Sequence, residues 1–160
     1  IDVGYGQLNW DLRNDERVVC MERTNIRYVE PEHLGCLTDF ASIDVSFISL
    51  KKVIPVAIKL IKDNGELLCL IKPQFEAGKD KVGKNGVVRD PEAHVEVVSQ
   101  IVSFSLEKGL LLKGLDYSPI KGPEGNIEYL AYFSKTDGLK DLSELQKEID
   151  KIVVSSHQEL

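Results

Sequence analysis

Apolar runs of strand length alternate along this chain with segments of helical periodicity, and this alternation constrains the fold more than any other feature. Strands are predicted near residues 18–22, 39–44, 66–72, 110–117 and 127–134, with residues 1–3 as the stump of another. Helices are predicted over residues 5–13, 50–63, 91–108 and 141–155. The alternation predicts parallel α/β architecture and disfavours a helical bundle or a β-sandwich.

Two of the predicted helices carry further signals. For the helix at 91–108, Asp90 can act as the N-cap, Pro91 suits the first position and Gly109 ends the helix. Residues 141–155 have one apolar face. For this segment a helix packed on the domain is favoured over a helix that binds a partner or dimerises.

Composition places the chain among ordinary globular domains. Its 160 residues are 42% hydrophobic and 29% charged, which suffices for one domain with a real core. No apolar run approaches the roughly 18 residues of a membrane span, and the first residues lack the pattern of a signal peptide. We therefore expect a cytoplasmic protein without membrane contact. The three cysteines lack C-x-x-C spacing, as expected of reduced thiols, and no metal site is expected because the three histidines lack metal-ligand spacing.

The charge is unevenly distributed. The formal net charge of −6 argues against a surface that is entirely a nucleic-acid footprint. Residues 72–89 nevertheless hold five basic and two acidic side chains, a balance of +3, whereas residues 137–160 hold three basic and six acidic ones, a balance of −3. The glycine-containing stretch 78–86 is interpreted as a mobile basic loop. A solvated lysine loop without a ligand explains this charge equally well.

Three apolar runs carry a charge at their end or inside them, at Asp44, Lys72 and Glu128. A buried charge costs several kcal/mol unless it is paired or used, and the carboxyl ends of strands in an open α/β sheet face the ligand crevice. Asp44 could instead be an ordinary helix-capping acid. Lys72 is harder to explain by packing, because Pro73 ends the strand where the side chain would enter the crevice. Acids and a lysine that converge there could poise the lysine as a base, provided that desolvation outweighs the acids.

Acidic and polar residues also follow two runs near the N-terminus, at Asp2 and at Glu22 to Asn25. An acid at the end of the second strand of a Rossmann-like sheet accepts hydrogen bonds from the ribose of an adenosine-containing cofactor. Asp2 could equally be a helix N-cap. The G-x-G-x-x-G, G-x-S-x-G and G-x-x-x-x-G-K-[ST] motifs are absent from the sequence, so nicotinamide dinucleotide binding, a serine nucleophile elbow and a P-loop have no support.

Five motifs occur in order along the chain: Asp2–Leu8, Glu22–Asn25, Asp44–Leu50, Lys72–Glu76 and Gly122–Tyr129. Together they resemble the TlyA family over about residues 1–134. That family comprises ribosomal RNA 2′-O-methyltransferases of the FtsJ-like superfamily, and its members are often named hemolysins. The resemblance implies a Rossmann-like methyltransferase fold with a mostly parallel sheet and helices on both faces.

The resemblance also implies a reaction and a set of site residues. The expected reaction is S-adenosylmethionine-dependent methylation of a ribose 2′-hydroxyl, on cytidine of ribosomal RNA or ribosomal subunits. The superfamily uses a Lys-Asp-Lys-Glu tetrad, whose last three members fall on Asp44, Lys72 and Glu128. Lys72 would be the base, Asp44 would position it and the methyl donor, and Glu128 would complete the charge network. The cofactor-binding residues implied are Asp2, Val3, Gly4, Glu22, Thr24, Asn25 and Asp44.

The family pattern begins before this sequence does. The first lysine of the tetrad, the glycine-rich cofactor motif, the first strand and a small S4-like RNA-binding domain would all precede Ile1. We therefore expect an N-terminally incomplete methyltransferase domain over residues 1–136, and an acidic amphipathic helix over residues 137–160 that is part of this domain or packed on it. A homodimer stays open. The alternative function is a non-catalytic Rossmann-like module that binds RNA or a partner, and membrane damage has little support because the last helix is acidic.

Overall fold

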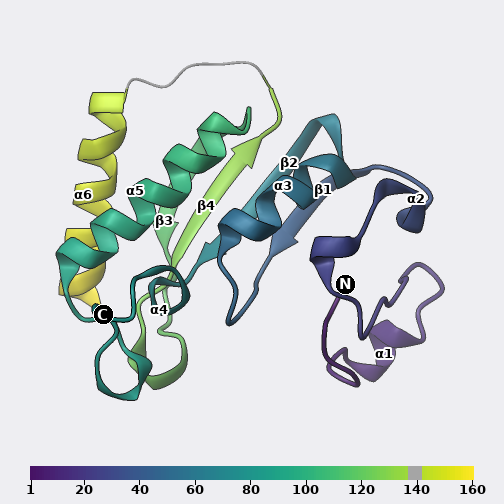
Figure 1. Ribbon diagram of the computed structural model, residues 1–160, viewed down its shortest axis with the longest axis horizontal. Coiled ribbons are helices and arrows are strands. Elements are labelled where there is room, and N and C mark those ends of the chain that lie inside the picture. Colours follow the sequence, from purple (N-terminus) through teal and green to yellow (C-terminus); the bar gives the residue numbers. More distant parts are fainter. Residues whose placement is uncertain (137–141) are drawn as a thin grey trace.

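A mixed four-stranded sheet organises the part of the chain that the computed structural model describes, residues 1–136 and 142–160 (Figure 1). The strands are β1 (Thr38–Ile43), β2 (Ile61–Ile71), β3 (Leu111–Tyr117) and β4 (Tyr129–Ser134), in the order β1-β2-β4-β3. β1 and β2 are parallel, whereas β4 is antiparallel to both β2 and β3. The α/β class is confirmed, but the expectation of a mostly parallel sheet is not exact, because β4 runs opposite to the other three strands and leaves β1 and β2 as the one parallel pair of this sheet. The connection from β3 to β4 contains no helix that could carry the chain back across the sheet, so β4 returns beside β3 in the opposite direction.

The helices differ widely in length. They are α1 (Trp10–Arg13), α2 (Pro31–Leu34), α3 (Leu50–Leu60), α4 (Pro73–Glu76), α5 (Pro91–Glu107) and α6 (Leu142–Glu159). Three short 3₁₀ turns accompany them: η1 (Ile26–Tyr28), η2 (Lys84–Gly86) and η3 (Pro123–Gly125). Of the predicted last segment, residue 141 lies outside the described residues, as do residues 137–140.

All three long helices cover the same face of the sheet. Their apolar residues share one core with the side chains that point to that face from β2 and β4. Those strand residues are fully buried: Leu67, Cys69, Ile71, Tyr129, Ala131 and Phe133. The connections β1-α3-β2 and β2-α5-β3 move across the sheet in the same direction, and right-handed crossovers in one direction place their helices on one face.

The other face of the sheet is different. Leu68 and Leu70 of β2 are only half-buried there, and Phe40 of β1 is 48% exposed. The expected cover of helices on both faces is therefore not found among the described residues. The direction of the two crossovers explains this difference.

Three predicted elements have other bounds in the structure. The helix expected to reach residue 63 ends at Leu60, and β2 begins at Ile61, which is fully buried. The pairing of β1 with β2 then skips residues 62–65, so these residues form an irregularity within the strand and not the end of a helix. The helix predicted over 5–13 is only α1, whose N-cap Asn9 accepts a hydrogen bond from the amide of Asp11.

No strand forms at residues 18–22 in the described chain, and residues 1–3 form none either. Three backbone hydrogen bonds join the chain around these two segments: Asp2 N donates to Met21 O over 2.8 Å, Thr24 N donates to Asp2 O over 2.9 Å, and Arg23 N donates to Gly4 O over 3.0 Å. Val19 is 84% exposed, although its neighbours Val18 and Cys20 are half-buried. A strand needs a regular ladder, and these bonds do not supply one.

A buried polar network joins α5, β4 and α6. His94 is fully buried; its Nδ1 lies 2.8 Å from the Tyr129 hydroxyl, and its Nε2 lies 2.9 Å from Val88 O. The Tyr129 hydroxyl also lies 3.1 Å from Ser156 Oγ on α6. Burial is the main cause that lowers the pKa of His94, and burial also raises the pKa of Tyr129 to about 12. The network therefore holds a neutral imidazole against the last helix.

Acid should weaken this fold through His94. Because the pKa of His94 is lowered in the folded state, the unfolded chain binds the proton first, and stability is lost as the pH falls below the ordinary histidine value of 6.5. We expect the free energy of unfolding to fall between pH 7.5 and 5.5 by at most about 1.4 kcal/mol per pH unit from this group. In His94→Gln this part of the slope should vanish in urea titrations at each pH, whereas replacing the exposed His33 should leave it. Equal slopes in wild type and His94→Gln would contradict this assignment.

Candidate active site

Asp44 and Lys72 meet at the carboxyl ends of the parallel strands β1 and β2. The register pairs Ile43 with Cys69, so the residues that follow each strand come out at the same edge. Lys72 Nζ lies 2.6 Å from Asp44 Oδ1 and 3.4 Å from Ser46 Oγ. The Lys72 side chain is 12% exposed and that of Asp44 is 69% exposed. A shielded ammonium group is thus held by a carboxylate that itself reaches solvent.

Glu128 reaches the same edge from the antiparallel side. Ile71 pairs with Tyr129, so the next residues in each direction, Lys72 and Glu128, stand opposite one another. Glu128 is buried, at 5% exposed, and its Oε1 accepts a hydrogen bond of 2.9 Å from Gln74 Nε2. Among the described ion pairs none joins Lys72 to Glu128. The structure therefore brings the three predicted residues to one edge, where Asp44 pairs with Lys72 and Glu128 bonds Gln74 instead.

Two residues of the turn before Glu128 fix its position. A Cβ atom at Gly122 would lie 2.3 Å from Glu128 Oε1, so only glycine leaves room for this carboxylate. Asn126 is buried, and its Oδ1 accepts a hydrogen bond from the amide of Val88 over 3.3 Å. Its Nδ2 donates to Gly86 O and to Pro123 O, at 3.1 and 3.0 Å. Asn126 thus ties the end of the basic loop to the turn that carries Glu128.

Glu76, for which the sequence predicts no role, connects the segment that follows β2 with the segment that follows β1. Its Oε2 accepts a hydrogen bond of 2.7 Å from Ser49 Oγ, and its Oε1 accepts one of 2.7 Å from the amide of Leu50. It therefore caps α3, which follows the Asp44 segment, from α4, which follows Lys72. Burial is the main cause that raises the pKa of Glu76. The acid in the motif Lys72–Glu76 was visible in the sequence, but its partners lie 26 and 27 residues away.

A hollow of about 530 Å³ opens at α4, in the segment that follows Lys72, and an exposed aromatic residue forms part of it. Its lining consists of Phe47, Gln74, Phe75, Ala77, Lys79 and Val82. Phe47 is 90% exposed and has a φ of 61°, which is uncommon for a bulky residue. Its ring centroid lies 4.8 Å from that of Phe75. Sequence patterns do not indicate this pair, because an apolar residue near a strand end is normally interpreted as core.

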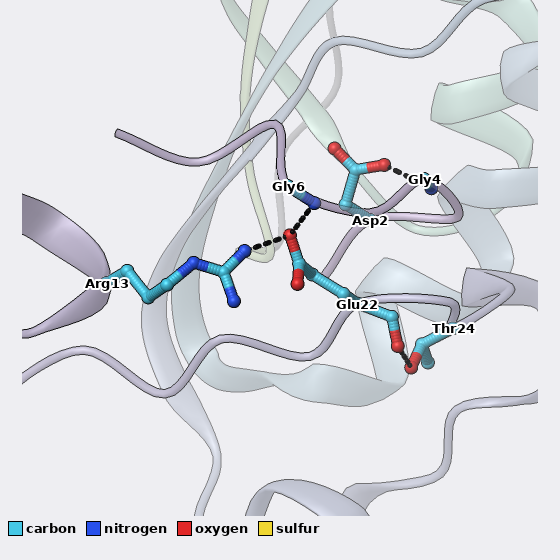
Figure 2. A network of polar contacts seen from close by, with 6 residues as sticks. All are labelled: Asp2, Gly4, Gly6, Arg13, Glu22 and Thr24. Carbon is cyan, nitrogen blue, oxygen red and sulfur yellow. Dashed lines mark hydrogen bonds and ion pairs between the residues drawn. The ribbon is translucent and has the colours of Figure 1, made fainter. Parts of the chain in front are cut away.

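The predicted cofactor residues near the N-terminus form a second polar cluster, which Figure 2 shows. Glu22 Oε1 accepts a hydrogen bond of 2.7 Å from the amide of Gly6 and forms an ion pair with Arg13. The bond from Arg13 is the main cause that lowers the pKa of Glu22. Asp2 Oδ1 accepts a 2.6 Å hydrogen bond from the amide of Gly4. Glu22 is therefore an ionised acceptor that also closes the loop between residues 6 and 13.

The other residues predicted to bind the cofactor lie around this cluster. Thr24 Oγ1 donates a hydrogen bond of 2.9 Å to Glu22 O, as Figure 2 also shows. Asn25 caps η1, because its Oδ1 accepts a hydrogen bond from the amide of Arg27 over 3.1 Å. Val3 is 75% exposed. The structure thus gathers Asp2, Gly4, Glu22 and Thr24, while the Asn25 side chain is used locally.

Two features are absent from the residues that the structure describes, a metal-ligand cluster and a membrane-spanning helix. Within residues 1–136 and 142–160, no group of three or more His, Cys, Asp or Glu side chains is placed to hold a metal ion. No helix in these ranges is long and apolar enough to cross a membrane.

Replacing Gly122 by alanine should disturb the site at one carboxylate. The added Cβ would overlap Glu128 Oε1, so either the turn or the buried acid must move. We expect Gly122→Ala to lower the free energy of unfolding by about 1–3 kcal/mol in urea titrations. Gly114→Ala is the matched control, because a Cβ at Gly114 meets nothing within 4 Å. A Gly122→Ala protein as stable as the control would show that Glu128 is not fixed by this contact.

Known proteins resemble this chain over most of its length. A family model of FtsJ-like methyltransferases matches residues 1–135. YqxC of Bacillus subtilis, which bears the name of an rRNA methyltransferase, is 47% identical over all of this chain and 58% of its own. TlyA of Mycobacterium tuberculosis, named a 16S/23S rRNA (cytidine-2′-O)-methyltransferase, is 44% identical over 85% of this chain and 51% of its own. The chain thus spans little more than half the length of these relatives.

A solved structure agrees with these matches. A protein from Streptococcus thermophilus named as a hemolysin superposes with a TM-score of 0.91 at 45% identity, over 98% of this chain and 56% of that one. A Listeria monocytogenes protein named as an S-adenosylmethionine dependent methyltransferase superposes with a TM-score of 0.51 at 15% identity, over 79% of this chain and 74% of that one, which supports the fold alone. The resemblance expected from the five motifs is confirmed, and the chain belongs to the FtsJ-like methyltransferase family.

Proposed function

We propose that the protein to which this chain belongs methylates a ribose 2′-hydroxyl of ribosomal RNA, on cytidine. The observation that carries the proposal is the Lys72–Asp44 ion pair at the carboxyl edge of the sheet, opposite the buried Glu128. Relatives that share the chain's sequence are named rRNA cytidine-2′-O-methyltransferases. The site residues and the family thus support the same reaction.

S-adenosylmethionine is the methyl donor of this family, and it supplies an electrophilic methyl group when bound. The residues present fit such a group, because Arg13 keeps Glu22 ionised and the Glu22 side chain remains 9% exposed. An ionised carboxylate in this position can accept hydrogen bonds from ribose hydroxyls. We assign cofactor binding to Asp2, Val3, Gly4, Glu22, Thr24 and Asn25, with Asp44 shared between the cofactor and Lys72.

In this proposal Lys72 accepts the proton of the 2′-hydroxyl at Nζ. The amine must be neutral at that moment, so it first gives up its own proton to solvent or to the neighbouring carboxylate. Asp44, 2.6 Å away, orients Nζ and stabilises the ammonium that forms. Glu128 stands opposite Lys72 and accepts a hydrogen bond from the Gln74 side chain. Proton transfer from a positioned lysine is the step that the chain's own residues contribute.

The hollow that Phe47, Gln74 and Lys79 line suits a nucleoside of single-stranded or looped RNA. RNA is recognised mainly through unstacked bases that lie on aromatic rings and through phosphates that meet lysines. Phe47 offers an exposed ring, and Lys79 of the basic loop lines the same hollow. The net charge of the whole chain is negative, so we place most of the RNA affinity elsewhere in the protein.

The finer assignments are also proposals. Ribosomal RNA or ribosomal subunits are the partners that the relatives' names suggest. An S4-like RNA-binding domain upstream, a homodimer and a cytoplasmic location would suit such a substrate. Hemolysin A of Brachyspira hyodysenteriae is 39% identical over 83% of this chain, but the described residues hold no membrane-spanning helix that would favour membrane damage.

Lys72→Ala in the full-length protein tests the proposal. We expect S-adenosylmethionine binding by titration calorimetry to stay within about twofold, because Lys72 lies at the acceptor side. Methyl transfer to ribosomal subunits, followed with a radioactive methyl group, should fall by about 100- to 10,000-fold. Lys113→Ala, at an exposed position of β3, should change neither measurement.

Two other outcomes would change the assignment. Unchanged transfer by Lys72→Ala would remove Lys72 from the role of base. A wild-type protein that binds no S-adenosylmethionine at saturating concentration would instead favour the non-catalytic RNA-binding or interaction module.

A further inference from the structure

His94 connects to the chain on both sides of Glu128. Its Nδ1 lies 2.8 Å from the hydroxyl of Tyr129, the residue that follows Glu128. Its Nε2 lies 2.9 Å from Val88 O, and the amide of Val88 donates to Asn126 Oδ1 over 3.3 Å. Asn126 stands two residues before Glu128. One imidazole on α5 is therefore linked directly to one neighbour of Glu128 and, through Val88, to the turn on its other side.

The partners of His94 determine which ring nitrogen carries the hydrogen. Val88 O can only accept a hydrogen bond, so Nε2 must be the donor. In the neutral imidazole Nδ1 is then an acceptor, and it takes the hydrogen of the Tyr129 hydroxyl. Both ring nitrogens are thus used, and His94 is fully buried, so water cannot replace either partner. The two contacts hold the ring in one position and one orientation.

Tyr129 and Glu128 share one stretch of paired backbone. Tyr129 is the first residue of β4, and Ser118 N donates to Glu128 O over 2.8 Å, so the pairing with the β3 side continues onto Glu128. A fixed Tyr129 ring therefore fixes the backbone that carries the Glu128 carboxylate. That carboxylate accepts the bond from Gln74 Nε2, and its place opposite Lys72 depends on where this backbone lies.

Packing alone does not require a polar chain at this place. The core cluster that contains Tyr129 is otherwise built from apolar side chains, and a phenylalanine ring would fill the same position. Buried hydrogen bonds add little net stability, because each group gives up its water when it is buried. A fully paired chain instead holds its members in a single arrangement. Two members of this chain, Tyr129 and Val88, are the links to the segments that flank Glu128.

We propose that His94 is a positioning residue for Glu128, which it holds opposite Lys72 through Tyr129 on one side and through Val88 and Asn126 on the other. The inference rests on the proposed methyltransferase function and deepens it. His94 is fully buried and touches neither substrate nor cofactor in this role. Its effect on methyl transfer therefore passes through Glu128.

Tyr129→Phe in the full-length protein tests this role, because it removes only the hydroxyl that His94 holds. We expect kcat for methyl transfer to ribosomal subunits to fall by about 10- to 100-fold, since a small misplacement of a reacting group costs that much. The KM for the subunits and the Kd for S-adenosylmethionine should stay within about twofold. Ser105→Ala is the matched control: it removes a buried hydroxyl of α5 that donates to Ile101 O, and it should keep the wild-type kcat.

A double-mutant cycle with Glu128→Gln separates positioning from damage to the fold. If His94 acts through Glu128, Tyr129→Phe should lower kcat by no more than about twofold once the carboxylate has been replaced. His94→Gln keeps a donor near the place of Nε2 and loses the contact with Tyr129, so it should behave as Tyr129→Phe does, and it serves in the same cycle if that protein does not fold.

Three outcomes would overturn the inference and leave the methyltransferase function intact. They are an unchanged kcat in Tyr129→Phe, an unchanged kcat in Glu128→Gln, and an equal fall caused by Tyr129→Phe with and without the Glu128 carboxylate. A wild-type protein that transfers no methyl group would show instead that the proposed function fails, and the inference with it.

Discussion

The pairing of β2 with a parallel strand on one side and an antiparallel strand on the other is the constraint on which the site depends. The parallel register with β1 brings Asp44 to Lys72, and the antiparallel register with β4 sets Glu128 opposite Lys72. A shift of one residue in either pairing would turn the side chain of Lys72 or its partner to the other face of the sheet. The fully buried residues of β2, Leu67, Cys69 and Ile71, fix that register because they fill the core under α3 and α5.

Behind the sheet edge, two polar residues connect segments that are distant in sequence. Glu76 joins the segment after Lys72 to the start of α3, and Asn126 joins the end of the basic loop to the turn before Glu128. Each makes its bonds to backbone groups, so each fixes a loop and not just one side chain. The carboxylates and the lysine therefore stand on loops that are tied together rather than on independent ones, which is the arrangement that positions a catalytic group closely.

The sequence could predict the strand ends but not the contacts between them. A charge that closes an apolar run stands out locally, so Asp44 and Lys72 were found without a structure. No such local signal marks the antiparallel direction of β4. That direction depends on the two strands between which β4 lies, β2 and β3. The bond between Gln74 and Glu128 joins residues 54 apart, and such a contact exists only in three dimensions. At residues 18–22 the apolar run predicted a strand, and that prediction is wrong, because a strand also requires a paired neighbour.

The places where local rules are broken gather around the candidate site. Among the residues that the structure describes, four that are not glycine have a positive φ: Arg23, Phe47, Asn85 and Glu124. They lie in the segment after Glu22, in the loop after Asp44, in the basic loop and in the turn before Glu128. Asparagine tolerates this conformation, but each of the others costs of order 1–3 kcal/mol. In the core beneath these loops His94 is fully buried and hydrogen-bonded. Strain in the loops that hold the predicted site residues is what selection for a functional geometry would leave.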